Sequence, residues 1–376
     1  MDDGPSRRRA LDIATLLRFL LSALLLLATP LAAAVTIERQ GVLYTGGETK
    51  GDAVVGQTFA FYQIPPKRAG RWPIIFIHGS RQTGAGFLGT PDGRPGWATF
   101  FLGHGWPVYV IDQPGKGKAG YNTQAYGPLS DVPSREHTIR QFSAPESLTP
   151  LPWPQASRHM QWPGGPRSGV SGQPAFEQLL ASQVGNMPNV RQQYALTLRG
   201  VSDLLHRIGP AIIVTHSQAG PLTWMIAQAN PGLVKALIAV EPTGDTGSSG
   251  EIGAACALTV ECLPFTPAVS GPADLHLTKS GPDTPASRAC WLQGGSVHRL
   301  PWLAGIPILI ATGEASYHAG SDHCTSAFLT QAGVPNDWVF LPTVGIRGNG
   351  HMQMLEANNL QIAAFYEQWL LKTLRR

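Results

Sequence analysis

Ser217 is the residue whose surroundings best fit covalent chemistry. It follows the apolar run 211–214 at the centre of the segment 215–219. A strand that turns sharply into a helix strains such a serine, exposes its hydroxyl and tolerates only small residues two positions away on either side. Thr215 and Ala219 are small enough for that turn, where glycine is commoner. We therefore expect Ser217 to be a nucleophile, although a serine that merely starts a helix has the same local sequence.

A serine nucleophile needs a general base, and His351 is the best placed of the eleven histidines. It lies in the glycine-rich segment 348–352, between a predicted strand and a predicted C-terminal helix. A loop of this kind brings an imidazole to a distant serine without burying unpaired backbone groups. The alternative interpretation is a surface or helix-capping histidine.

The imidazole in turn needs a carboxylate to hold its tautomer, and three residues are candidates. Glu241 follows a predicted strand at 234–240, and Pro242 comes directly after it. Glu314 and Asp322 follow the next predicted strand, the more usual place for this acid. The residues alone leave the choice open, because a serine stands at 316 where an aspartate is ordinarily found.

Backbone N–H groups at two places are candidates for an oxyanion hole. His78-Gly79 follows the apolar run 74–77, so the N–H of Ser80 is expected to face the same space as the N–H of Gln218. Two such donors stabilise the negative oxygen of a tetrahedral intermediate.

Short buried apolar runs alternate with helical patterns along the chain, which predicts a mostly parallel sheet covered by helices on both faces. Strands are predicted at 35–44, 57–64, 74–77, 108–111, 211–214, 234–240, 306–310 and 338–341, and helices at 97–102, 190–208, 221–229 and 353–374. In such a sheet the carboxyl ends of the strands bring the candidate residues to one edge. Segments 113–176 and 242–304 are rich in turn residues, and we interpret them as lid-like insertions in a single domain, 35–376.

The N-terminus predicts export. Arginines at 7–9 precede an apolar stretch at 19–28, and alanines at 32–34 offer a cleavage site, so residues 1–34 are interpreted as a signal peptide. The alternative is an uncleaved anchor. We expect a secreted or periplasmic protein with no stable membrane anchor after cleavage.

The four cysteines all follow the leader, so two disulfides are expected in an oxidising compartment. Three pairings are possible. We favour Cys256–Cys262 and Cys290–Cys324, because the first pair shares one short segment. Their spacing does not fit a metal site, which needs closely paired ligands.

Composition narrows the class of partner. Charged residues make up 14% of the 376 residues and the net charge is +4, so no nucleic-acid-binding surface is expected. No G-x-G-x-x-G follows a predicted strand, and no cofactor is implied. A metal-dependent hydrolase based on His318 and His323 lacks a second ligand group at helical spacing, and no metal is expected.

Several short motifs together resemble the α/β-hydrolase superfamily, and more narrowly a group of secreted bacterial and fungal esterases. The motifs are His78-Gly79, Thr90-Pro91-Asp92-Gly93-Arg94, Gly96-Trp97-Ala98, Asp112-Gln113-Pro114-Gly115, His216-Ser217-Gln218, Val240-Glu241-Pro242 and Gly350-His351-Met352. The resemblance covers nearly all of the mature length. It implies an α/β-hydrolase fold and a Ser-His-Glu triad of Ser217, His351 and Glu241, with the acid after the sixth strand. Thr215 departs from the glycine of the elbow, and Ser80 stands where some relatives carry cysteine.

These observations predict a secreted serine carboxylesterase that acts through an acyl-enzyme on a small-molecule or polymeric ester. The same triad would also serve a lactonase, a polyester hydrolase or an amidase. A non-catalytic binding protein on the same fold is the alternative from another class. A homodimer is possible. Four residues are predicted to contact the substrate: His216, Trp224, Tyr317 and Met352.

Overall fold

The computed structural model describes residues 35–68, 72–244, 256–284 and 286–374. Residues Ile37–Arg376 form one compact unit. The predicted signal peptide, 1–34, lies outside the described residues. No helix of the described ranges combines the length and the apolar character needed to cross a bilayer.

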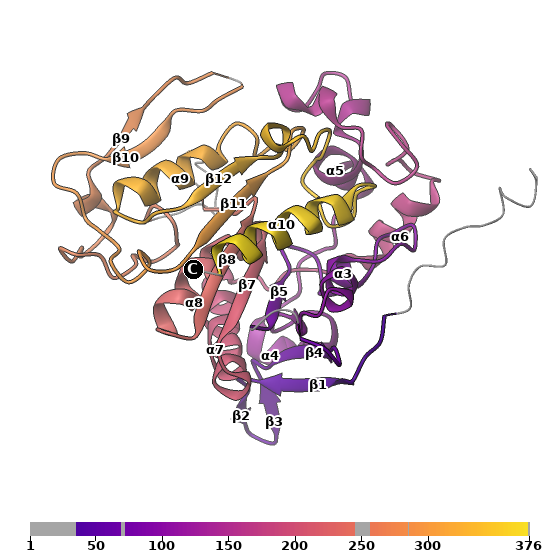
Figure 1. Ribbon diagram of the computed structural model, residues 1–376, viewed down its shortest axis with the longest axis horizontal. Coiled ribbons are helices and arrows are strands. Elements are labelled where there is room, and N and C mark those ends of the chain that lie inside the picture. Colours follow the sequence, from indigo (N-terminus) through magenta and orange to yellow (C-terminus); the bar gives the residue numbers. More distant parts are fainter. Residues whose placement is uncertain (1–34, 69–71, 245–255, 285, 375–376) are drawn as a thin grey trace, which may run out of the picture. The chain divides into compact units, whose positions relative to one another are not determined.

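An eight-stranded sheet runs through this unit in the order β1-β4-β6-β5-β7-β8-β11-β12 (Figure 1). β1 and β4 are antiparallel to their neighbours, and all pairs from β6 to β12 are parallel. The sheet is therefore mostly parallel, as the sequence predicted. The strands of the sheet are β1 Arg39–Thr45, β4 Thr58–Ile64, β5 Ile74–Ile77, β6 Val108–Asp112, β7 Ala211–His216, β8 Val234–Val240, β11 Ile308–Thr312 and β12 Asp337–Phe340. Two small hairpins pair β2 Glu48–Lys50 with β3 Ala53–Val55, and β9 Leu277–Ser280 with β10 Cys290–Gln293.

The central strands are continuous apolar runs because both faces of the sheet are covered. Every residue of β5, β6, β7 and β11 is buried. Successive side chains point to opposite faces, so Ile75 and Ile77 join one hydrophobic cluster while Ile74 and Phe76 join the other. Helices α7 and α8 contribute to the first cluster, and α3 and α10 to the second.

All four predicted helices are present, together with others that were not predicted. The helices of the described residues are α2 Ala85–Leu88, α3 Trp97–Gly103, α4 Thr123–Tyr126, α5 Arg135–Thr138, α6 Pro174–Ser182, α7 Val190–Ile208, α8 Gly220–Ala229, α9 Asp322–Gln331 and α10 Asn359–Thr373. The prediction of a helix from 353 was wrong by six residues at its start. Buried Glu356 explains the difference, because its carboxylate accepts hydrogen bonds from Gly350 N and Asn349 Nδ2 and holds 349–356 as a turn.

Both predicted disulfides are formed, Cys256–Cys262 and Cys290–Cys324. The second joins the hairpin strand β10 to α9. It therefore fixes part of the 242–304 segment to the body of the unit.

Candidate active site

Ser217 lies in the strained turn that its sequence predicts. Its φ is +55°, a left-handed conformation that costs a non-glycine residue about 1–3 kcal/mol. Thr215 supports the turn, because its hydroxyl is hydrogen-bonded to the Thr223 hydroxyl of α8 at 2.6 Å. Thr243 N also donates to Ser217 O at 2.9 Å. The neighbouring strand end therefore holds the backbone of Ser217.

Gly79 allows the loop after β5 to pass directly over Ser217. A Cβ at Gly79 would lie 2.8 Å from the Ser217 Cβ and 3.1 Å from Nδ1 of His216. Only glycine fits such a close approach without moving the turn. Ser80, the predicted oxyanion residue, thus follows a residue in contact with the candidate nucleophile.

Asn186 holds the loop after β5 through hydrogen bonds to Ser80 and Arg81. Its Nδ2 donates to Ser80 Oγ at 2.7 Å, and its Oδ1 accepts from Arg81 N at 3.0 Å. Nζ of Lys116 also donates to Oδ1 of Asn186, at 2.5 Å. Lys116 is 2% exposed, and burial, with a contribution from Arg81, lowers its pKa to about 7. Lys116 and Asn186 could not be identified from the sequence, since nothing in their local patterns marks them.

His351 and Glu241 meet in the interior. Nδ1 of His351 and Oε2 of Glu241 are 2.5 Å apart, and neither side chain is more than 1% exposed. Burial raises the pKa of Glu241, while His318 and several hydrogen-bond donors act in the opposite direction. Those donors are Gly313 N at 2.7 Å, Ser316 Oγ at 2.5 Å and Gln353 Nε2 at 3.1 Å.

His351 is also tied to the strand end that carries Ser217. Nε2 of His216 is 3.0 Å from the His351 carbonyl oxygen, and the two imidazole centroids are 4.5 Å apart. The Tyr317 hydroxyl lies 3.0 Å from Nε2 of His351. Burial, followed by the neighbouring His318, holds the pKa of His351 well below its ordinary value. His351 is therefore set up to be neutral and able to accept a proton.

The other two candidate acids have different partners. Glu314 accepts from Gly348 N at 2.8 Å and holds the loop that leads to His351. Asp322 binds Nδ1 of His318 and the Thr312 hydroxyl, each at 2.8 Å. Of the three acids that the sequence left open, Glu241 is the one whose carboxylate is hydrogen-bonded to Nδ1 of His351 in the described structure.

Comparisons with known proteins agree with this fold. No protein-family model matches the sequence. The chain is 36% identical over 347 residues to a probable secreted lipase, phiG, from Fungal sp. (strain ATCC 74256), and the match covers 88% of each chain. Its fold matches a solved structure, a novel bacterial esterase, with a TM-score of 0.58, 24% identity and coverage of 91% of this chain and 98% of the other. The chain belongs to the α/β-hydrolase superfamily.

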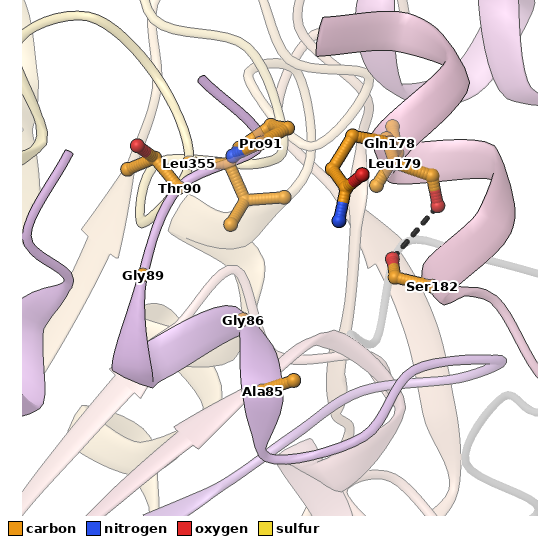
Figure 2. Close-up of a pocket in the computed structure, with 9 residues that line it drawn as sticks. All are labelled: Ala85, Gly86, Gly89, Thr90, Pro91, Gln178, Leu179, Ser182 and Leu355. Carbon is orange, nitrogen blue, oxygen red and sulfur yellow. Dashed lines mark hydrogen bonds between the residues drawn. The ribbon is translucent and has the colours of Figure 1, made fainter. Parts of the chain in front are cut away.

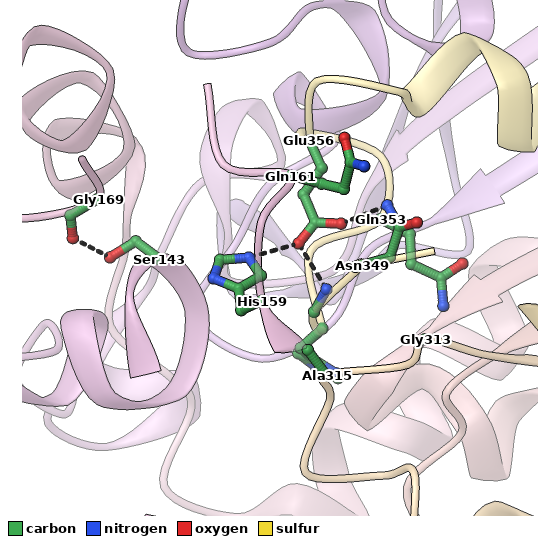
Figure 3. Close-up of polar contacts among 12 residues, drawn as sticks. Ser143, His159, Gln161, Gly169, Gly313, Ala315, Asn349, Gln353 and Glu356 are labelled. Atoms are coloured by element: carbon green, nitrogen blue, oxygen red, sulfur yellow. Dashed lines mark hydrogen bonds and ion pairs between the residues drawn. The ribbon is translucent and has the colours of Figure 1, made fainter. Parts of the chain in front are cut away.

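A buried ion cluster holds the candidate base loop of this α/β-hydrolase in place (Figure 3). Nδ1 of His159 is 2.8 Å from Oε2 of Glu146, and Nε2 of His159 is 3.0 Å from Oε1 of Glu356. Glu356 also accepts hydrogen bonds from Asn349 and Gly350, directly before His351. This cluster joins the 113–176 segment to the loop, and no pattern in the sequence marks it.

Two of the predicted substrate contacts are core residues in this α/β-hydrolase. Trp224 is 1% exposed and packs in the hydrophobic cluster that contains α8. Met352 is equally buried, and its Sδ accepts from Nε2 of Gln82 at 3.3 Å. The helix and the loop turn both side chains into the interior, and their contact with a substrate stays a prediction. His216 and Tyr317 contact His351 as described above.

A cavity of about 210 Å³ lies between α2, α6 and the loop after His351 (Figure 2). Its lining consists of Ala85, Gly86, Gly89, Thr90, Pro91, Gln178, Leu179, Ser182 and Leu355. It is smaller than ordinary ligand pockets of about 300–1,000 Å³, and no residue of the candidate triad lines it. Because no triad residue lines it, this cavity does not by itself locate a substrate at Ser217.

Two groups of side chains bring metal-ligand atoms together in the described residues. In the first, Cys290 and Cys324 are joined in a disulfide beside His323, so their sulfur atoms are not thiolates. In the second, Glu241, His318 and His351 present atoms within 4.8 Å of one another. The carboxylate of Glu241 already accepts four hydrogen bonds, and a cation bound to Oε2 would compete with those from Ser316 and His351.

Proposed function

We propose that this α/β-hydrolase is a secreted serine carboxylesterase that forms an acyl-enzyme on Ser217. The observation that carries the proposal is the buried hydrogen bond between His351 Nδ1 and Glu241 Oε2, beside the strand end that carries the strained Ser217. The name of the related lipase supports an ester substrate. The two disulfides and the secreted relative support export.

The proposed reaction has two halves. Oγ of Ser217 attacks the ester carbonyl carbon while Nε2 of His351 takes the hydroxyl proton, and Glu241 stabilises the imidazolium. The N–H groups of Ser80 and Gln218 stabilise the oxyanion. His351 then gives its proton to the departing alcohol. In the second half a water, deprotonated by His351, attacks the acyl carbon and releases the acid and Ser217.

Aromatic side chains around His351 support an ester with an apolar part. The Phe142 ring stacks 5.8 Å from the His351 imidazole, and the Tyr317 ring is 4.6 Å from it. Trp153 packs edge-on against Tyr317 at 5.6 Å and donates from Nε1 to Ala315 O. We propose that Tyr317 and Trp153 form one wall of the subsite for the alcohol part of the ester. The Tyr317 hydroxyl lies 3.0 Å from Nε2 of His351, the atom that protonates the departing alcohol in the proposed reaction.

The test is hydrolysis by the purified mature chain of short and long nitrophenyl esters, lactones, an amide and a polyester, with Ser217→Ala as the control. A fluorophosphonate adduct on Ser217 identifies the nucleophile independently of the substrate. Esters should be hydrolysed fastest; a preference for lactones, a polyester or an amide would reassign the substrate class. A chain that neither turns over nor forms the adduct would be a binding protein.

The acid has its own matched test. Glu241→Gln should lower kcat by about 10⁴-fold, because the amide favours the wrong imidazole tautomer. Glu314→Gln is the comparison and should lower kcat far less, since Glu314 follows the next strand and bonds Gly348 N in the loop before His351 rather than the imidazole. The reverse result would move the acid to Glu314.

A further inference from the structure

A second carboxylate–imidazole pair lies beside the candidate triad. His318 is 6% exposed and Asp322, the first residue of α9, is fully buried. Nδ1 of His318 is 2.8 Å from Oδ1 of Asp322, and Oδ2 of Asp322 accepts from the Thr312 hydroxyl at 2.8 Å. The carboxylate is therefore fixed on both oxygens, and it fixes the orientation of the His318 ring.

The His318 ring stacks on the imidazole of His351. Their centroids are 5.1 Å apart and their planes differ by 9°. Ligand atoms of Glu241, His318 and His351 lie within 4.8 Å of one another. Ser316 links the two pairs, because its hydroxyl donates to Glu241 and accepts from His318 N at 3.1 Å. The two imidazoles thus face the same carboxylate.

Charge balance distinguishes the two rings. Two buried carboxylates without a cation would carry a large desolvation penalty, so a positive charge in the cluster is favoured. Asp322 stabilises that charge on His318, whereas Nε2 of His351 must stay free of a proton to act as a base. Two imidazolium ions stacked at this distance would repel each other.

We propose that His318 is a positioning residue that Asp322 holds as an imidazolium, so that His351 stays neutral and the enzyme remains active at acidic pH. The proposal rests on the proposed esterase function. Charged and titratable groups of the described residues face this pair from four sides: His216 at the end of β7, Glu241 at the end of β8, Tyr317 in the loop after β11, and Asp322 in α9.

The pKa shifts of His351 and Glu241 both have the direction expected for a positive charge on His318. His318 contributes, after burial, to the lowered pKa of His351. It also opposes the rise that burial causes in the pKa of Glu241. A cation at His318 therefore keeps Glu241 ionised and His351 unprotonated at the same time.

The first experiment measures the rate of fluorophosphonate labelling of Ser217 against pH, because that rate follows the fraction of neutral His351 without depending on a substrate. His318→Gln should move the acidic limb upward by about one to two pH units, as expected for removing a charge about 5 Å away. Asp322→Asn should move it in the same direction. His323→Gln is the control, since His323 is next to Asp322 on α9 but contacts Cys324 and Trp338. An unchanged acidic limb in both His318→Gln and Asp322→Asn would overturn the proposal.

The second experiment needs no variant to fold. Nitrogen-15 NMR of histidine-labelled wild-type enzyme should show His318 with both ring nitrogens protonated at pH 7, and a neutral imidazole there would refute the proposal. This readout is independent of catalysis. A chain that hydrolyses no ester but has a charged His318 would therefore refute only the esterase function.

Discussion

Replacing His159 tests how the structure holds the loop that carries the candidate base. The His159 side chain is fully buried between Glu146 and Glu356. His159→Gln removes the positive charge and leaves two carboxylates facing each other in the interior. Losing one partner of such a buried cluster costs about 3–5 kcal/mol of unfolding free energy.

The pKa of His159 predicts how the free energy of unfolding should change with pH. Burial alone would lower the pKa of His159, but the bonds to Glu146 and Glu356 outweigh it and raise the pKa from 6.5 to about 9. A difference of about 2.5 in pKa corresponds to about 3 kcal/mol. Because the folded pKa lies above the unfolded one, this stabilisation is fully present below pH 6.5 and is lost as the pH rises through 9.

The assay is urea unfolding of the wild type and of His159→Gln at pH 6, 7.5 and 9.5, with the disulfides intact. The difference in unfolding free energy between the wild type and His159→Gln should fall by about 3 kcal/mol from pH 6 to pH 9.5. His104→Gln is the control, since His104 pairs with Glu367 at the partly exposed surface. Parallel pH curves for wild type and His159→Gln would refute the reasoning.

Three further perturbations have defined outcomes. Gly79→Ala should lower kcat/KM by about 10²-fold with little change in Tm, because the added methyl group displaces Ser217. Unchanged kinetics would mean that the loop after β5 moves to make room for the methyl group. Ser316→Ala removes a hydrogen bond to the acid and should lower kcat by about 10-fold, and an unaffected kcat would show that the remaining donors suffice. Cys290→Ala should destabilise by about 4 kcal/mol and Cys262→Ala by about 2, since the disulfides close loops of 34 and 6 residues; equal losses in urea unfolding would contradict this entropic account.

The sheet could be predicted from the sequence because its central strands are buried on both faces. A strand such as β5 has no polar position to interrupt its apolar run, so its bounds were found without error. The start of α10 was misplaced because Glu356, which sets it, acts through backbone groups of the preceding loop. The burial of Trp224 could not be predicted for a related reason, since an aromatic residue near a site has the same sequence whether it faces the core or a ligand.

The candidate site could be predicted less completely. Glu241, Glu314 and Asp322 all follow strands that end at one edge, and sequence position does not say which carboxylate turns toward His351. The positive φ of Glu241 directs it there, and the hydroxyl of Ser316 helps to hold it. The His159 cluster could not be predicted, because its partners are 13 and 197 positions away and share no periodicity.

The contact between Ser316 and Glu241 shows how an acid could migrate between neighbouring strands during divergence. The oxygen atoms of the two side chains are 2.5 Å apart, so a carboxylate at either position would lie near the imidazole of His351. An intermediate with an acid at both positions would place two carboxyl groups in contact in the interior, so one of them would have to stay protonated. Exchanging the acid and the hydroxyl between 241 and 316 would reconstruct that path in the laboratory.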